Sequence, residues 1–152
     1  MSKPNEKTYE FTVTASKSIW LPIFLAWLVC VIGVLGSLFF SEVMQFPPCV
    51  LCWYQRIGLY PLVAVFSVGI LHRDPNVSRY AWPILLFGLA MAGYHNLVYY
   101  HLIPESITPC SEGVPCTSRQ IEWFGVITIP MLSLLNFLFI AGCLLKFRRS
   151  IK

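Results

Sequence analysis

Four long stretches of apolar residues dominate this chain of 152 residues and limit the folds that it can adopt. Residues 19–40, 80–103 and 124–145 contain no Asp, Glu, Lys or Arg, and residues 52–71 contain only Arg56. A helix needs about 20 mostly apolar residues to cross a bilayer, and each stretch is long enough. The sequence therefore predicts an all-α integral membrane protein, a bundle of four transmembrane helices.

The polar parts of the chain are short. Charged residues make up 12% of the chain, about half of the ~25% typical of a soluble domain. We therefore expect one transmembrane domain and no separate soluble domain. The expected boundaries are a polar N-terminal tail at 1–18, a transmembrane domain at 19–146 with spans at about 19–40, 52–71, 80–101 and 124–145, and a C-terminal tail at 147–152.

Positively charged residues gather in the segments that would lie on one side of the membrane. Nine of the eleven Lys and Arg residues occur in residues 1–18, in residues 72–79 or after residue 145. Because Lys and Arg in short segments stay preferentially in the cytoplasm, we expect both termini to be cytoplasmic. Arg56 and Arg119 would then lie on the outer side. The net charge of +4 follows from this topology, and we expect no nucleic-acid partner.

The six cysteines divide into two kinds. Cys30 and Cys143 lie within apolar stretches, and we expect them to be buried and inert. The other four form two pairs, Cys49 with Cys52 and Cys110 with Cys116, in segments that share the outer side in this topology. Two cysteine pairs at one membrane surface indicate thiol and disulfide chemistry.

The first pair is placed to be reactive. Two prolines at 47 and 48 precede Cys49 and favour the start of a helix, so Cys49 and Cys52 should occupy its first turn. Unpaired backbone N–H groups at a helix N-terminus favour a thiolate over a thiol. Arg56 follows Cys52 by four residues and shares its helix face. This arginine either extends to the lipid headgroups or contacts a redox partner at the membrane surface.

The second pair lies in a segment that favours a turn. Gly113, Pro109 and Pro115 surround Cys110 and Cys116, which such a turn would bring within reach of a disulfide bond. Outside the cytosol this pair should oxidise readily. A purely structural loop disulfide is an equally good interpretation of the spacing alone.

Two other classes of protein are compatible with four outward cysteines. One is a membrane transporter or metal chaperone that binds a metal through all four thiolates, although a spacing of five residues between Cys110 and Cys116 is unusual for such ligands. The other is a structural four-helix protein whose disulfides only brace its loops. The second class leaves Arg56 beside a helix-terminal Cys-x-x-Cys unexplained.

Taken together, these motifs resemble the DsbB family of disulfide-forming quinone reductases, especially its compact BdbC-type branch. The resemblance rests on residues 49–56 (CVLCWYQR), on the cysteine pair at 110 and 116, and on residues 119–125 (RQIEWFG). It covers nearly the whole chain from the first apolar stretch to the last. The related epoxide-reductase-like family places its loop cysteines before the helix-terminal Cys-x-x-Cys, and the order here is the reverse.

The resemblance implies an electron relay at the outer face of the bacterial cytoplasmic membrane. A reduced thioredoxin-like oxidase of the DsbA or BdbD type would attack the Cys110/Cys116 disulfide, forming its mixed disulfide with Cys110. Cys116 would then exchange with Cys49, and Cys52 would pass the electron pair to a membrane quinone, either menaquinone or ubiquinone. The protein would thus be a protein-disulfide:quinone oxidoreductase that supports disulfide formation in exported proteins.

Two further residues enter through the resemblance. Arg56 is expected to support the bound quinone. His95, near the outer end of the third apolar stretch, is expected to lie close to the quinone. His101 is nearly as well placed, and an ordinary interfacial histidine is an equally good interpretation of each.

Overall fold

The computed structural model describes residues 6–103, 116 and 128–151, and the described chain is almost entirely helical. The helices are α1 (Glu6–Leu38), a short π-helical turn η1 (Phe39–Val43), α2 (Val50–His72), α3 (Val77–Tyr99) and α4 (Ile129–Ile151). Four segments are long and apolar enough to cross a membrane: Ile19–Val43, Val50–His72, Val77–Tyr99 and Ile129–Ile151. The predicted fold class, an all-α membrane protein with four spanning helices, is confirmed.

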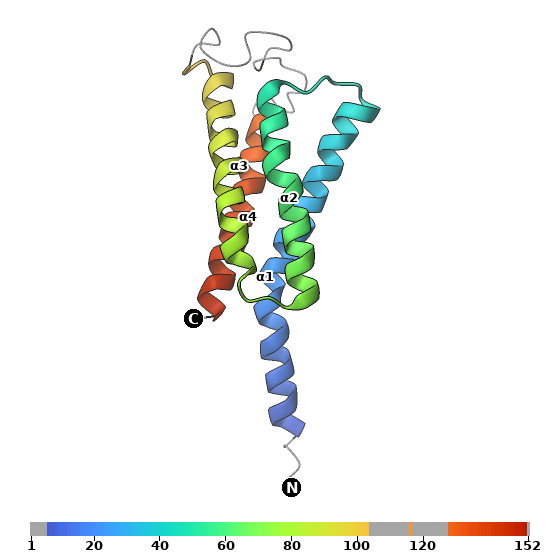
Figure 1. Ribbon diagram of the computed structural model, residues 1–152, viewed down its shortest axis with the longest axis vertical. Helices are drawn as coiled ribbons and strands as arrows, with labels where there is room; N and C mark the ends of the chain where they lie inside the picture. Colours follow the sequence, from blue (N-terminus) through green and yellow to red (C-terminus); the bar gives the residue numbers. More distant parts are fainter. Residues whose placement is uncertain (1–5, 104–115, 117–127, 152) are drawn as a thin grey trace.

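The helices form a bundle in which chain neighbours lie side by side. α2 packs against α1 and α3, and α4 packs against α1 and α3, so the bundle closes on itself. Figure 1 shows the two termini and the α2–α3 turn at the same end, with α1 extending beyond the bundle. The N-terminal Cys-x-x-Cys end of α2 therefore lies at the opposite end.

Two helices are longer than hydropathy alone indicates. α1 begins at Glu6 and includes most of the segment expected as a polar tail. α4 continues to Ile151 and carries Arg148 and Arg149 in its last turn, where cations interact favourably with the helix dipole. Hydropathy detects the part of a helix that fits in hydrocarbon, whereas backbone hydrogen bonding continues through polar residues on either side.

The interior of the bundle is apolar, and so is much of its outer surface. Phe66, Phe137 and Phe147 are among the largest fully buried side chains, whereas Leu35 and Leu71 are highly exposed. Outward-facing apolar side chains are what a lipid environment requires. Both cysteines that were expected to be inert are free thiols of this core: Cys30 is fully buried, and Cys143 is partly buried.

Helices α2, α3 and α4 approach one another closely at two glycines. A Cβ atom at Gly58 would come within 3.0 Å of the Cα atom of Gly88, and a Cβ atom at Gly88 would overlap the ring of Phe137. Small residues at such crossings let transmembrane helices pack through van der Waals contact. Gly93 is different, because a Cβ atom there would meet nothing within 4 Å.

Replacing Gly88 with valine is expected to destabilise the bundle by about 1–3 kcal/mol, the usual cost of overpacking a core. The thermal unfolding midpoint of the detergent-solubilised protein should fall accordingly. Gly93→Val on the same helix is the matched control and should leave the midpoint close to that of the wild type. Equal effects of the two substitutions would show that the Gly88 crossing does not limit stability.

Candidate functional site

The first cysteine pair begins α2, as the two preceding prolines predict. Cys49 is the N-cap residue with extended backbone angles, φ −68° and ψ 166°, and its sulfur accepts a hydrogen bond from the backbone N–H of Cys52 at 3.3 Å. The two sulfur atoms lie 2.7 Å apart, and both residues are free thiols. A single turn of helix therefore holds both sulfurs in place for conversion between dithiol and disulfide.

A buried histidine from α3 lies beside Cys49. The Nε2 atom of His95 is 3.8 Å from the Cys49 sulfur and 3.3 Å from the carbonyl oxygen of Cys116. Its Nδ1 atom is 2.8 Å from Nε2 of Gln55. An amide nitrogen only donates, so we assign Nδ1 as the acceptor and place the proton of the neutral ring on Nε2. His95 thus presents an N–H group to Cys49 and Cys116.

Cys116 belongs to the same small cluster as Cys49. It is disulfide-bonded and 3% exposed, and it packs with Leu51 and Val98 at the end of the bundle. Its predicted partner, Cys110, lies outside the described residues, as does the expected motif at 119–125. The structure therefore brings one member of the second pair next to Cys49.

The surroundings of Cys49 favour its thiolate. The hydrogen bond from the Cys52 thiol is the largest cause, and the hydrogen bond and electrostatic interaction with His95 act in the same direction. Burial opposes them, but the net effect lowers the pKa of Cys49 to about 5. A thiolate that persists at neutral pH is the form that attacks disulfides and takes part in exchange.

The alkylation rate of Cys49 in the reduced protein should reveal this depressed pKa. Because the thiolate reacts, the rate should be constant above about pH 6 and should fall through a midpoint near pH 5 as protonation begins. Iodoacetamide labelling read out by peptide mass spectrometry measures it. In Cys52→Ala the midpoint should move upward, since the main cause is removed. A wild-type midpoint near the ordinary thiol value of about 8.5 would contradict this assignment.

Cys52 packs against the same cluster as Cys49 and also lines a pocket of about 310 Å³ formed by α1, η1, α2 and α4. Cys52 lines this pocket, whereas Cys49 and His95 do not. The lining is largely apolar, with a few polar side chains. The pocket residues are Ile32, Gly33, Gly36, Ser37, Phe40, Ser41, Phe46, Pro48, Cys52, Gln55, Arg56, Leu59, Ile129, Leu132, Ser133, Asn136 and Phe137.

Arg56 supplies the positive charge of the pocket. Its Nη2 atom donates a hydrogen bond to the carbonyl oxygen of Ser37 at 2.9 Å, and its guanidinium carbon lies 5.3 Å from the ring centroid of Trp53. Its Nε atom is buried and has no hydrogen-bond partner among the described residues. The side chain is thus held against α1 at the pocket and keeps one donor free.

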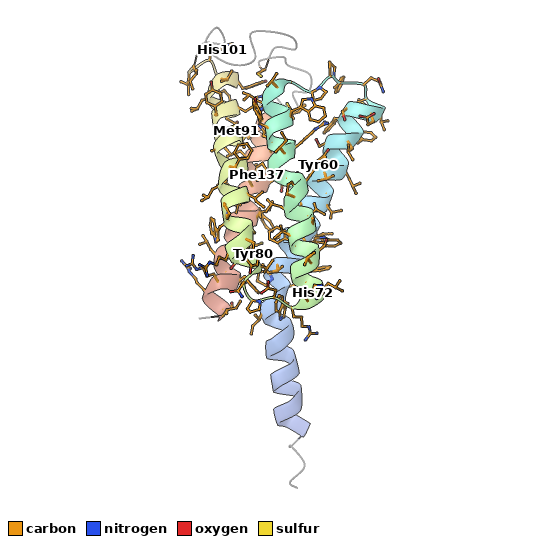
Figure 2. All side chains as sticks on the ribbon, in the orientation of Figure 1. Tyr60, His72, Tyr80, Met91, His101 and Phe137 are labelled. Carbon is orange, nitrogen blue, oxygen red and sulfur yellow. The ribbon has the colours of Figure 1, made fainter. Side chains whose placement is uncertain are left out.

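The two histidines singled out in the sequence lie in different environments. His95 is buried beside Cys49, and the lining of the pocket does not include it. His101 follows α3 with a positive φ of 57° and is exposed; Figure 2 shows it at the opposite end of the bundle from His72. A direct contact of either histidine with a quinone remains a prediction.

The sequence analysis did not identify two polar residues of the site, Gln55 and Asn136. Gln55 follows Cys52 by one helical turn and is 8% exposed. Asn136 is a polar residue within an uncharged apolar stretch, and its amide oxygen is buried without a partner among the described residues. Polar residues within membrane spans are costly and often functional, which is the signal that could have identified both.

Three residues at this end of the bundle are arranged so that they could hold a metal ion. The donor atoms of Cys49, Cys52 and His95 all lie within 4.8 Å of one another. Two thiolates and an imidazole suit a soft or borderline cation such as zinc. This set differs from the four-cysteine site considered from the sequence, because a histidine joins only one of the two pairs.

Comparison with known proteins shows which family this chain resembles. Residues 17–147 match the family model described as disulfide bond formation protein DsbB. The chain is 42% identical over 130 residues to disulfide bond formation protein C of Bacillus subtilis, covering 84% of this chain and 94% of that protein. It is 46% identical over 118 residues to probable disulfide formation protein C 2 of Bacillus cereus, covering 78% and 84%.

A relative outside Bacillus shows similar coverage. The chain is 41% identical over 131 residues to a probable disulfide formation protein of Metapseudomonas resinovorans, covering 86% of this chain and 91% of that protein. No solved structure matches the chain. The family match covers nearly all of the four-helix bundle and contains both cysteine pairs of this chain. The chain therefore belongs to the DsbB family of disulfide bond formation proteins.

Proposed function

We propose that this protein is a membrane thiol oxidase that reoxidises an extracytoplasmic thioredoxin-like oxidase and passes the electrons to a membrane quinone. The observation that carries the proposal is that one member of the first cysteine pair, Cys52, also lines a pocket. Both cysteines pack in the cluster that contains the disulfide-bonded Cys116, and Cys52 also lines the pocket that contains Arg56. One turn of α2 therefore connects a thiol-exchange site to a ligand site.

The exchange begins at the second pair. The dithiol of a DsbA- or BdbD-like partner attacks the Cys110/Cys116 disulfide, forms a mixed disulfide with Cys110, and leaves as a disulfide. The resulting dithiol reduces the Cys49–Cys52 disulfide through a Cys116–Cys49 bond. Free thiols at Cys49 and Cys52 together with a disulfide at Cys116 correspond to the state after this exchange.

His95 assists the exchange at Cys49. Its Nε2–H group points to the sulfur at 3.8 Å, and Gln55 holds the ring through Nδ1 at 2.8 Å. A donor in this position stabilises the Cys49 thiolate that leaves when Cys110 attacks the Cys116–Cys49 bond and re-forms the Cys110/Cys116 disulfide. In this role His95 acts on cysteine, and Gln55 is a positioning residue.

The pocket fits a quinone head group. Its volume of about 310 Å³ is at the lower end of the range for small-molecule sites. Its apolar walls suit a ring, and the unpaired Nε–H of Arg56 is a donor for a carbonyl oxygen. When bound, a quinone would take up the two electrons and two protons that the Cys49–Cys52 dithiol loses as it returns to a disulfide. Arg56 would hold an oxygen of the quinone, and Cys52 is the cysteine that lines the same pocket.

The membrane side follows from the charge distribution. We infer that the basic ends of the chain lie in the cytoplasm and that the cysteine pairs face outward from the bacterial cytoplasmic membrane. Figure 1 supports this arrangement, since both termini lie at the end of the bundle away from the start of α2. There the pairs can meet an exported dithiol partner and the quinone pool together.

A coupled assay tests the proposed function. Purified protein in detergent is mixed anaerobically with a reduced dithiol protein and a soluble quinone, and quinone absorbance and thiol loss are followed together. We expect equal amounts of quinol and disulfide, and no quinol with Cys52→Ser. The absence of quinone reduction, together with tight zinc binding by Cys49, Cys52 and His95, would instead favour a metal-binding protein.

A further inference from the structure

Two residues that line the pocket each carry a buried polar atom without a partner among the described residues. These atoms are Nε of Arg56 on α2 and Oδ1 of Asn136 on α4. A buried polar atom without a hydrogen bond is destabilising, so such atoms in native structures call for an explanation. One atom is a donor and the other is an acceptor. Together they indicate a ligand that offers an acceptor to Nε–H of Arg56 and a donor to Oδ1 of Asn136.

The two residues are anchored one turn apart along α1. Arg56 donates to the carbonyl oxygen of Ser37 at 2.9 Å, and the Asn136 amide lies so close to Gly33 that a Cβ atom there would overlap its Nδ2 atom. Four residues of helix separate Gly33 from Ser37, a rise of about 6 Å. The two oxygens of a 1,4-quinone stand at opposite ends of one six-membered ring, a comparable separation.

We propose that Asn136 binds the end of the ring opposite to Arg56 and recognises its reduced form, the quinol. This inference rests on the proposed function of the pocket. The carbonyl oxygens of a quinone only accept hydrogen bonds, so Oδ1 of Asn136 stays unpaired in the oxidised complex. A quinol hydroxyl donates, and it satisfies Oδ1. Arg56 binds both the quinone and the quinol, because a hydroxyl oxygen also accepts a hydrogen bond from its Nε–H.

The preference of Asn136 for the quinol favours reduction of the bound quinone. The Cys49–Cys52 dithiol loses two electrons and two protons and becomes a disulfide, and the quinone gains them and becomes the quinol. A hydrogen bond made only by the product stabilises the reduced ligand in the pocket and draws the electron pair forward. Asn136 is therefore a specificity residue for the redox state of the ligand.

The test compares the two forms of one ligand. The probe is 2,3-dimethyl-1,4-naphthoquinone, with its quinol added as a product inhibitor under anaerobic conditions and the dithiol-reduced full-length protein as electron donor. In Asn136→Leu the inhibition constant of the quinol should rise about tenfold, the effect of one hydrogen bond of about 1.4 kcal/mol. The KM of the quinone should change less than about threefold.

Two further variants complete the design. Gly33→Ala displaces the same amide from the α1 side and should weaken quinol inhibition in the same direction. Leu138→Ala, at an exposed apolar position of α4, is the matched control and should behave as the wild type. Unchanged quinol inhibition in Asn136→Leu and Gly33→Ala, or equal changes for both redox forms, would overturn the inference. A wild-type protein that reduces no quinone would instead remove the proposed function itself.

Discussion

Replacing Arg56 with alanine should lower kcat/KM for the quinone by about 10- to 100-fold, since a hydrogen bond from a charged group contributes about 1.5–3 kcal/mol. The Nε–H of Arg56 is the donor without a partner at the pocket, and its guanidinium is fixed by Ser37 and Trp53. The measurement is quinone reduction by the dithiol-reduced protein at several quinone concentrations. The loss should appear only in this half of the reaction.

The other half of the reaction provides the control. A pre-oxidised Arg56→Ala protein should still oxidise one equivalent of a reduced dithiol partner at the wild-type rate. Thiol exchange between Cys49 and Cys116 does not use the quinone pocket that contains Arg56. Arg56→Lys should give an intermediate defect, since lysine keeps the positive charge but lacks the planar guanidinium group with its several fixed donors. Equal loss in both half-reactions, or in neither, would contradict the role assigned to Arg56.

Replacing Cys52 with alanine should abolish quinone reduction and trap a disulfide between Cys49 and Cys116. Cys49 lies in one cluster with Cys116. Without Cys52, the Cys49 thiolate cannot re-form the Cys49–Cys52 disulfide. Non-reducing peptide mapping after incubation with a reduced dithiol partner and mild oxidant measures the bond. The protein also carries Cys110→Ala, because a Cys110 thiol would attack the Cys49–Cys116 bond and resolve it.

The reciprocal variant makes the experiment specific. In the same Cys110→Ala background, Cys49→Ala should form less Cys52–Cys116 disulfide, because Cys49 is buried in the cluster with Cys116, whereas Cys52 is only partly buried there and also lines the pocket. Similar amounts of trapped disulfide in the two variants would show that the cysteines are interchangeable. That result would contradict the assignment of thiol exchange to Cys49 and of electron transfer to the pocket to Cys52.

The sequence was sufficient for the four helices and for the start of α2. Uncharged apolar runs report directly on membrane spans, and the prolines at 47 and 48 mark the residue at which α2 can begin. The extension of α1 down to Glu6 carried no comparable signal. Helical hydrogen bonds continue through polar residues that hydropathy assigns to a tail.

The internal layout of the site depends on contacts between helices. Spacing along α2 groups Cys49, Cys52 and Arg56, but it does not reveal that His95 of α3 lies beside Cys49 or that Cys52 lines a pocket formed with α1 and α4. The hydrogen bond between Gln55 and His95 joins residues 40 positions apart. Asn136 gains its position only when α4 packs against α1. Such contacts follow from the packing of the bundle, which local sequence patterns do not encode.

The most direct test of the electron path is a single turnover in the absence of any partner. Fully reduced protein is mixed anaerobically with one equivalent of quinone, quenched with acid and alkylated, and its first disulfide is mapped. The account predicts one quinol per protein and a first disulfide between Cys49 and Cys52. A first disulfide between Cys110 and Cys116, or thiol loss without quinol, would contradict it.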